Sequence, residues 1–423
     1  MVGDLQQKES IEIQKKEDWK IAFGAALAMV AGNAPISLFS FGALIKPLQA
    51  QHGWDRAQVS LAPSLAALFA TIWIPFLGAA IDRWGLKRVM IPGILAYALN
   101  LALIGQAAAL PVFIALIALT GITGAVQTAV GYAKSVASHF ESHRGLALGI
   151  AMAGVGVGTA IMPLYIQTVL SRFGLAYAYP SLALVVLVLA LPSVIFLVQE
   201  PYNPALRVAG AATAMVPGVT LHEALRSRVF WLLGASVLSV STVTTGVLVH
   251  IVPLVTDHGM SPGDAAKVMG AAGAATIVGR LLTGFLVDRI FAPMVGSAVF
   301  LTAVVGLYLL VTGASPVAGA VLIGFATGTE VDLIGYLVSR YFGMKRFGQI
   351  YGYIFAAFGL GASAGPFLVG TLFTAEGGYN LAFSIFAVLL VFASGMMLCL
   401  GRFPDHEEGA ISTSGARPRT STA

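Results

Sequence analysis

One arginine stands alone inside an apolar stretch in the second half of the chain. Arg280 lies between Lys267 and Asp288, and no other charged residue falls between those two. A cation at the centre of a membrane-spanning helix costs roughly 2.5–3.5 kcal/mol even on the most lenient insertion scale. Arginines at such a depth are retained where they face a polar cavity, so Arg280 is our candidate for an anion-binding residue. The alternative is that a fixed acid on a neighbouring helix neutralises it.

Two acids, Glu330 and Asp332, lie near the centre of another apolar stretch. Residues two apart on a helix point in directions about 200° apart, so these side chains cannot both face one cavity. A carboxyl group removed from water binds a proton more readily, which suits a proton carrier. The alternative is that one of the two acids pairs with Arg280, because buried charges need partners. We favour Glu330 as the group that gains and loses a proton.

Five more polar residues fall inside apolar stretches and could line a binding site: Asn33, Gln127, Tyr132, His250 and Tyr336. A histidine can relay a proton or bind a carboxylate, and His250 lies near the outer end of its segment. The alternative for His250 is a packing role at the membrane interface. For the other four the alternative is a hydrogen bond between helices, a common feature of membrane bundles.

Twelve apolar segments carry these residues. Mean hydropathy is +0.86 and only 10% of residues are charged, whereas soluble domains carry about 25%. Segments long enough to span a bilayer occur at 20–45, 59–81, 89–108, 111–137, 146–170, 178–198, 229–255, 264–287, 293–313, 316–341, 349–373 and 379–401. If both termini are cytoplasmic, 19 of the 24 Lys and Arg residues face the cytoplasm and four face outward. By the positive-inside rule we therefore predict a multi-pass protein of the cell membrane in that orientation.

An internal repeat divides the segments into two sets of six. The stretch from Gly78 to Arg83 matches the stretch from Gly284 to Arg289, 206 residues later. Segments five and eleven match at an offset of 203, where Gly145, Gly149, Gly156, Gly158 and Pro163 correspond to Gly348, Gly352, Gly359, Gly361 and Pro366. We predict an all-α membrane protein of two pseudo-symmetric six-helix bundles, with a site between them. The expected divisions are a tail at 1–19, bundles at 20–199 and 229–401, a linker at 200–228 and a disordered tail at 402–423.

The stretch from Gly78 to Arg88 resembles the G-x-x-x-D-R-x-G-R-[RK] motif of the major facilitator superfamily. The resemblance covers about residues 20–401 and implies a twelve-helix transporter that works by alternating access. Within that superfamily, the stretch from His139 to Gly154 is similar to the monocarboxylate transporters and to their bacterial relatives, which include the oxalate/formate antiporter. The resemblance further implies that Arg280 binds a substrate carboxylate. It also implies gate latches that act by charge pairing, at Asp82, Arg83, Asp288 and Arg289.

Three positions depart from those relatives. The animal monocarboxylate transporters have a lysine after a proline of the first span, whereas here Pro35 is followed by Ile36. The acid that accompanies the arginine in span eight is absent. The antiporter's second cation in span eleven is replaced by Phe358. These departures argue against lactate as the substrate, and against a dicarboxylate, which would need two cationic partners.

We predict a secondary transporter that moves a small organic anion, a monocarboxylate, together with protons. The expected partners are that anion, protons and the lipid bilayer; nucleic acid is not expected, and the chain is expected to work as a monomer. The sequence has no phosphate-binding loop, no metal-ligand spacing and no catalytic triad, so no cofactor, metal or enzymatic activity is expected. The alternatives are an exchanger or exporter without proton coupling, and a sensor on the same scaffold that does not transport. Two intact latch sequences argue against the sensor, because a sensor need not cycle.

Overall fold

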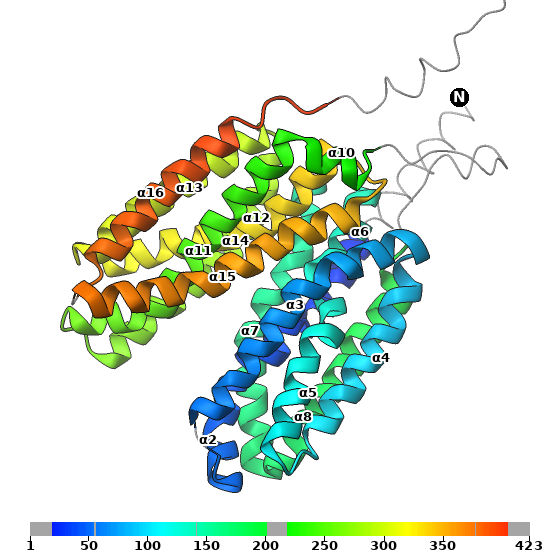
Figure 1. Ribbon diagram of the computed structural model, residues 1–423, viewed down its shortest axis with the longest axis vertical. Helices are drawn as coiled ribbons and strands as arrows, with labels where there is room; N and C mark the ends of the chain where they lie inside the picture. Colours follow the sequence, from blue (N-terminus) through cyan, green and yellow to red (C-terminus); the bar gives the residue numbers. More distant parts are fainter. Residues whose placement is uncertain (1–18, 55, 141, 201–217, 377, 405–423) are drawn as a thin grey trace, which may run out of the picture.

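The computed structural model describes residues 19–54, 56–140, 142–200, 218–376 and 378–404, and almost all of them are helical. Twelve helical segments of this described part are long and apolar enough to cross a membrane, as the sequence predicted. They form two bundles of six, which lie side by side in Figure 1. Most of the predicted tails and residues 201–217 of the predicted linker lie outside the described residues.

The first bundle starts with the segment Trp19–Ser37. The π-helical turn η1 (Ala34–Phe39) and α2 (Phe41–His52) complete the first passage. The remaining five spans are α3 (Arg56–Trp84); α4 (Leu86–Ile104); α5 (Leu110–Thr123) with η2 (Gly124–Gln127) and α6 (Ala129–His139); α7 (Arg144–Phe173); and α8 (Ala178–Val185) with η4 (Val186–Ala190) and η5 (Ser193–Leu197).

The second bundle follows a short helix, α10 (Leu221–Arg226), which begins with a capping box between Thr220 and Glu223. Its six spans are α11 (Arg228–Asp257), α12 (Pro262–Val287), α13 (Ala292–Val311), α14 (Pro316–Phe342), α15 (Phe347–Glu376) and α16 (Asn380–Leu398). Three of these helices have proline within their first two positions, where the missing N–H costs no hydrogen bond.

Two predicted spans of the first bundle are interrupted. The expected helix at 20–45 breaks before η1, because Pro35 has no N–H to continue the helical ladder. The expected helix at 111–137 is divided between α5 and α6 by the 3₁₀ turn Gly124–Gln127, after which Thr128 is extended. Interrupted helices at membrane depth are tolerated where the freed polar groups are buried in protein.

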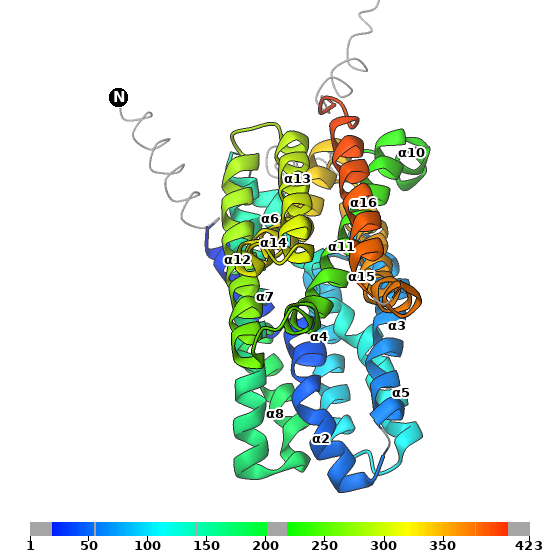
Figure 2. The same ribbon diagram turned by 90° about the vertical axis from the view of Figure 1, so that its left-hand side faces the viewer.

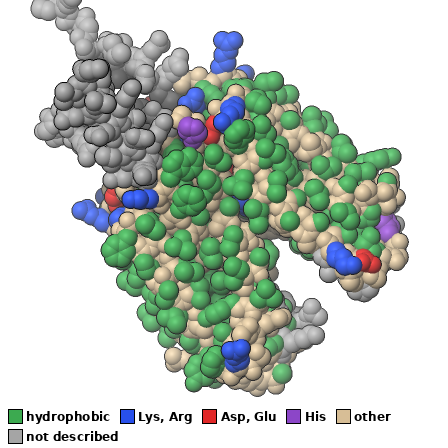
Figure 3. All heavy atoms as spheres, turned by 180° about the vertical axis from the view of Figure 1, so that it is seen from behind, with side chains coloured by type: hydrophobic (Ala, Val, Ile, Leu, Met, Phe, Trp, Pro, Cys, Tyr) green, Lys and Arg blue, Asp and Glu red, His purple; other side chains and the backbone are tan. Residues whose placement is uncertain are grey.

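The two bundles touch at one end and separate at the other (Figure 1). At the touching end, hereafter the closed end, α3 packs on α15 and α7 packs on α12. Figure 2 shows α12 continuing the line of α7 along one edge of the molecule. The opposite end, hereafter the open end, is where Figure 3 shows a hollow between the bundles.

Glycines make the closed end tight. A Cβ on Gly78 would collide with the carbonyl oxygen of Gly348, and a Cβ on Gly145 would collide with that of Gly284. These four glycines are the residues that the internal repeat matched in pairs. Small residues allow membrane helices to approach closely, since lipid supplies no hydrophobic force between them.

The outer surface of both bundles is apolar. Hydrophobic side chains cover the flanks in Figure 3, and charged side chains gather toward the ends. Phe196, Phe367 and Val388 are examples, with 77%, 70% and 68% of their surface exposed. A continuous apolar surface of this kind would be an aggregation hazard in water, and it fits contact with lipid tails.

Candidate functional site

Arg280 lies in the second bundle where α12 and α14 are in contact over their whole central region. Gly324 and Gly328 on α14 are one turn apart, and a Cβ on either would collide with a carbonyl oxygen of α12. Gly279, next to Arg280, makes the reverse contact with Phe325. This small-xxx-small pattern brings the backbones of the two helices together and places Arg280 against α14.

Asp332 is the acid that neutralises Arg280. The guanidinium Nη1 donates to Asp332 Oδ1 over 3.0 Å, and the two residues are 8% and 4% exposed. The pair is only partly satisfied, because Arg280 Nε and Asp332 Oδ2 have no hydrogen-bond partner among the described residues. A buried charged group left with an unmade hydrogen bond pays a desolvation cost. The pair therefore keeps one donor and one acceptor available.

Tyr351 on α15 belongs to the same cluster, and the sequence analysis did not identify it. Its ring is fully buried, its hydroxyl has no partner among the described residues, and it interacts electrostatically with both Asp332 and Arg280. The sequence gives only a weak signal for Tyr351, because a lone tyrosine near the start of a span is more often an interfacial residue. Three helices, α12, α14 and α15, thus bring polar atoms without partners to one place.

Glu330 faces a different helix from Asp332, as the 200° separation predicted. Its Oε1 accepts a hydrogen bond from Thr244 Oγ1 of α11 over 2.6 Å, and only 3% of the residue is exposed. It makes no ion pair within the described part of the chain. Asp332 is thus the acid that pairs with Arg280, the alternative given for one of the two acids, and Glu330 as the proton-binding group stays a prediction. Thr244 was not a candidate, because nothing in the sequence distinguishes it from the other hydroxyl residues of its helix.

Three of the other polar candidates bond within the first bundle. Tyr97 donates to Asn33 Oδ1 over 3.2 Å, and Tyr132 donates to Gln127 Oε1 over 2.7 Å. The Asn33 bond joins two spans, which was the alternative role given for it, whereas the Tyr132–Gln127 bond lies within one interrupted span; binding roles for the three residues stay predictions. The Gln127 amide nitrogen, buried in the broken span, has no partner in the described structure.

His250 and Tyr336 lie away from Arg280. The His250 Nε2 is 3.3 Å from the carbonyl oxygen of Pro366, and its ring contacts Tyr379 at the far end of α11. Tyr336 stacks edge-on against Phe403 and interacts electrostatically with Asp288 at the closed end. Neither residue forms a hydrogen bond or ion pair with the Arg280 cluster within the described residues, so both remain predictions as substrate ligands.

Asp82 and Asp288 join the bundles at the closed end. Asp82 accepts hydrogen bonds from the backbone N–H groups of Gly348 and Gln349, at 3.0 and 2.8 Å. Its Oδ1 also pairs with Lys134 of α6 at 2.7 Å. In this way a carboxylate of the first bundle caps the start of α15, where helix N–H groups lack partners and the helix dipole favours negative charge.

Asp288 makes the matching contact in the other direction. Its two carboxylate oxygens accept from the N–H groups of Gly145 and Leu146, at 2.7 and 3.0 Å, at the start of α7. Burial raises the pKa of Asp288 above its usual value, although the hydrogen bonds from Leu146 and Gly145 act to lower it. Asp82 and Asp288 therefore contact the opposite bundle through carboxylate-to-backbone hydrogen bonds, whereas the resemblance implied charge pairing, and their role as gate latches stays a prediction.

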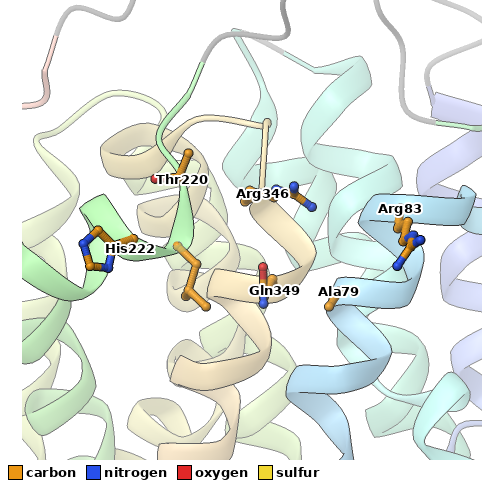
Figure 4. A pocket seen from close by; sticks show the side chains of 7 residues that line it. Ala79, Arg83, Thr220, His222, Arg346 and Gln349 are labelled. Atoms are coloured by element: carbon orange, nitrogen blue, oxygen red, sulfur yellow. The ribbon is translucent and has the colours of Figure 1, made fainter.

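Arg83 and Arg289 make no ion pair among the described residues. Arg289 donates to the carbonyl oxygen of Phe285 and lies over its ring, 3.5 Å from the centroid. Arg83 lines an open pocket of about 670 Å³ at the closed end, between α3, α10 and the start of α15. Figure 4 shows Arg83 and Arg346 on opposite walls of this pocket. The pocket does not include Arg280 or Asp332.

No group of three or more His, Cys, Asp or Glu side chains in the described residues is arranged to hold a metal ion. The one cysteine of the chain, Cys399, is a free and exposed thiol. The chemistry that the central cluster can perform is therefore ion pairing, hydrogen bonding and proton binding, through Arg280, Asp332, Glu330 and Tyr351.

Comparisons with known proteins agree with this architecture. A family model described as Major Facilitator Superfamily matches residues 21–366. Monocarboxylate transporter 13 of Rattus norvegicus is 25% identical over 394 residues, which cover 90% of this chain and 88% of the relative. Monocarboxylate transporter 11 of Mus musculus is 26% identical over 403 residues, which cover 90% and 87%. Among solved structures, the E. coli fucose:proton symporter superposes with a TM-score of 0.68 at 17% identity, covering 90% of this chain and 98% of the symporter.

Proposed function

Because this chain belongs to the Major Facilitator Superfamily, we propose that it is a proton-coupled transporter of a small organic anion with one carboxylate group. Arg280 binds the carboxylate, and Asp332 carries the proton that accompanies it. The chain lies in the cell membrane with both termini in the cytoplasm, as the distribution of Lys and Arg supports. Its relatives that are called monocarboxylate transporters support this class of substrate.

The half-satisfied pair of Arg280 and Asp332 carries this proposal. A purely structural ion pair in a protein core is stabilising only if its remaining donors and acceptors are also bonded. Here Arg280 Nε and Asp332 Oδ2 are both left without a partner in the described structure. A carboxylate ligand can fill the guanidinium fork with two parallel hydrogen bonds, the geometry in which arginine binds carboxylates most strongly.

Proton coupling follows from competition for Arg280. While no anion is bound, the guanidinium at 3.0 Å favours the ionised form of Asp332. A substrate carboxylate that takes over the guanidinium leaves Asp332 as a buried charge without a cation, and a charge in that position is costly unless it is protonated. Anion binding and proton uptake at Asp332 are therefore favourable together. Glu330, bonded to Thr244, is the second group that can take part in this exchange.

The closed and open ends correspond to one state of the alternating-access cycle. The positive-inside rule places the closed end, with Asp82 and Asp288, on the cytoplasmic side, so the hollow between the bundles faces outward. A substrate from outside reaches Arg280 through that hollow. Release to the cytoplasm then requires that the bonds from Asp82 to α15 and from Asp288 to α7 break.

The proposed function is tested by isothermal titration calorimetry, which measures the binding of carboxylates to purified protein in lipid nanodiscs. We expect a monocarboxylate to bind the wild type. We expect no binding heat when the same acid is titrated into Arg280→Ala. Lys267→Ala is the matched control, because Lys267 is on the same helix but is exposed and bonded to Asp264. Equal carboxylate affinity of the wild type and Arg280→Ala would refute the assignment.

A further inference from the structure

A row of stacked aromatic rings runs along one face of α15; it begins with Phe347, and its next ring, Tyr351, belongs to the Arg280 cluster. Tyr351 stacks on Phe355 with ring centroids 5.7 Å apart, and Phe355 stacks on Phe358 at 5.2 Å. The planes of neighbouring rings are within 17° and 28° of parallel. We call Tyr351, Phe355 and Phe358 the ring ladder. The three rings therefore form one continuous apolar row along the helix.

The ring ladder faces the interior and not the lipid. Tyr353, Leu360 and Phe367 are 40%, 54% and 70% exposed and mark the outer face of α15. Each residue of the ladder is two positions from Tyr353 or Leu360, and two positions on a helix correspond to about 200°. On the flanks of the ladder, Gly352 and Gly359 contact α3, and Gly361 and Gly365 contact α11.

The ladder leads from the carboxylate site toward the open end. The start of α15 lies at the closed end, where Gly348 bonds to Asp82, so higher residue numbers lie closer to the hollow. Tyr351 is fully buried beside Arg280 and Asp332, whereas Phe355 and Phe358 are only partly buried. From Tyr351 to Phe358 the helix rises roughly 10 Å, about the length of one aromatic ring with a short acid side chain.

We propose that the transported anion is a monocarboxylate with an aromatic body, which deepens the function proposed above and rests on it. Its carboxylate binds Arg280 and accepts a hydrogen bond from the free hydroxyl of Tyr351. Its ring lies against Phe355 and Phe358, which supply apolar area and offset stacking. Phe358 provides no cation for a second carboxylate, so the far end of the substrate is apolar.

The test compares three acids that differ only in their body: acetate, cyclohexylacetate and phenylacetate. Binding to the wild type is measured by calorimetry in nanodiscs, where passive diffusion of the neutral acids across a membrane does not interfere. We expect phenylacetate to bind at least tenfold more tightly than acetate and about threefold more tightly than cyclohexylacetate. Phenylacetate binding no tighter than either of the other acids would overturn the proposal.

Variants locate the effect on the ladder. Phe355→Ala and Phe358→Ala should each weaken phenylacetate about tenfold and change acetate less than twofold. Phe367→Ala is the matched control, because it removes the same ring from the lipid-facing side of the same helix. If the alanine variants fail to fold, Phe355→Leu and Phe358→Leu keep apolar volume and should still lose the preference for phenylacetate over cyclohexylacetate. A loss shared equally by all three acids would contradict the ladder as a substrate surface.

Failure of this inference can be told from failure of the proposed function. If acetate and phenylacetate bind equally and both need Arg280, only the aromatic body is wrong. If no carboxylate binds in an Arg280-dependent way, the proposed function is itself wrong, and the inference falls with it.

Discussion

Asp82 and Asp288 make the same contact in opposite directions between the two bundles. Each carboxylate accepts hydrogen bonds from two successive N–H groups at the start of a helix in the other bundle, at distances between 2.7 and 3.0 Å. They differ in one respect: Asp82 also pairs with Lys134, and Asp288 has no ion pair within the described residues. The closed end thus has two matching carboxylate-to-backbone contacts between the bundles, and among the described residues only the one at Asp82 includes an ion pair.

Removing the charge of Asp82 should favour the state in which the closed end separates. Hydrogen bonds to charged groups contribute about 1.5–3 kcal/mol, and asparagine keeps one acceptor but loses the charge. We expect Asp82→Asn to shift the equilibrium toward that state, because it weakens the bonds from the N–H groups of Gly348 and Gln349 and leaves Lys134 without its buried partner. Substrate affinity should stay within a few-fold of the wild type.

Spin-label distances between the closed ends of α3 and α15 measure this shift directly. Asp264→Asn is a suitable control, since Asp264 is an acid of α12 at the opposite end of that helix. Unchanged distances in Asp82→Asn, or a complete loss of binding in correctly folded protein, would contradict this role.

The latch at Asp288 should respond to pH. Burial raises the pKa of Asp288 in the closed arrangement, and exposure to water on opening would return it toward about 3.9. Protonation favours the arrangement with the higher pKa, so acidification should increase the closed population as the pH falls through the raised pKa. The same spin-label distances, recorded from about pH 7 to about pH 4, measure this. Asp288→Asn should lack the part of the pH dependence that comes from Asp288. A pH profile identical to that of the wild type in this variant would show that Asp288 is not the responsible group.

Arg280 and Asp332 should depend on each other for stability. Removing one member of a buried ion pair leaves an uncompensated charge and costs about 3–5 kcal/mol, whereas removing both costs much less. We therefore expect Arg280→Ala to lower the melting temperature in nanodiscs, and Arg280→Ala combined with Asp332→Ala to recover much of the loss without restoring substrate binding. Additive destabilisation in the double variant would show that the two side chains are not energetically coupled.

Arginine chemistry, beyond positive charge, should matter at position 280. Lysine is a point charge without the planar fork that binds both oxygens of a carboxylate. Arg280→Lys should keep the ion pair with Asp332 and hence near-normal stability, but weaken carboxylate binding by at least tenfold. Calorimetric titration alongside thermal melting separates these two effects. Wild-type affinity in Arg280→Lys would show that the fork is not used.

Much of the fold was predictable from two features of the sequence, its apolar segments and its internal repeat. Twelve apolar segments and two matched stretches, Gly78 to Arg83 and Gly284 to Arg289, predicted the spans and the two bundles. The breaks near Pro35 and Gly124 were less accessible, because apolar segments look continuous whether or not their helices are interrupted.

The site was predictable only as far as single residues stand out. Arg280, Glu330 and Asp332 stand out because charge is rare at membrane depth. Their partners depend on which faces of α11, α12 and α14 meet. Gly324 and Gly328 bring α14 against α12, but this contact is visible only in the packed structure. Tyr351 and Thr244 carry no charge, so their roles became apparent only from their burial and their partners.

Glu330 should influence coupling without holding the substrate. Its one hydrogen bond comes from Thr244, at 2.6 Å, so Glu330→Gln, which mimics the protonated acid, should leave binding affinity within a few-fold. Thr244→Val is the matched change on the other side of that bond. If Glu330→Gln binds substrate normally and retains full proton-driven accumulation, Glu330 is a structural residue and Asp332 alone carries the proton.

The central claim is that a proton is taken up at Asp332 when the anion binds Arg280. Its most direct test is accumulation of a labelled monocarboxylate in proteoliposomes driven only by a pH difference, with protein-free liposomes subtracted to remove passive diffusion of the neutral acid. We predict that the wild type concentrates the label above the external level, and that Asp332→Asn exchanges label across the membrane but does not concentrate it. Accumulation by Asp332→Asn equal to that of the wild type, or none by the wild type, would contradict this account and favour an exchanger without proton coupling.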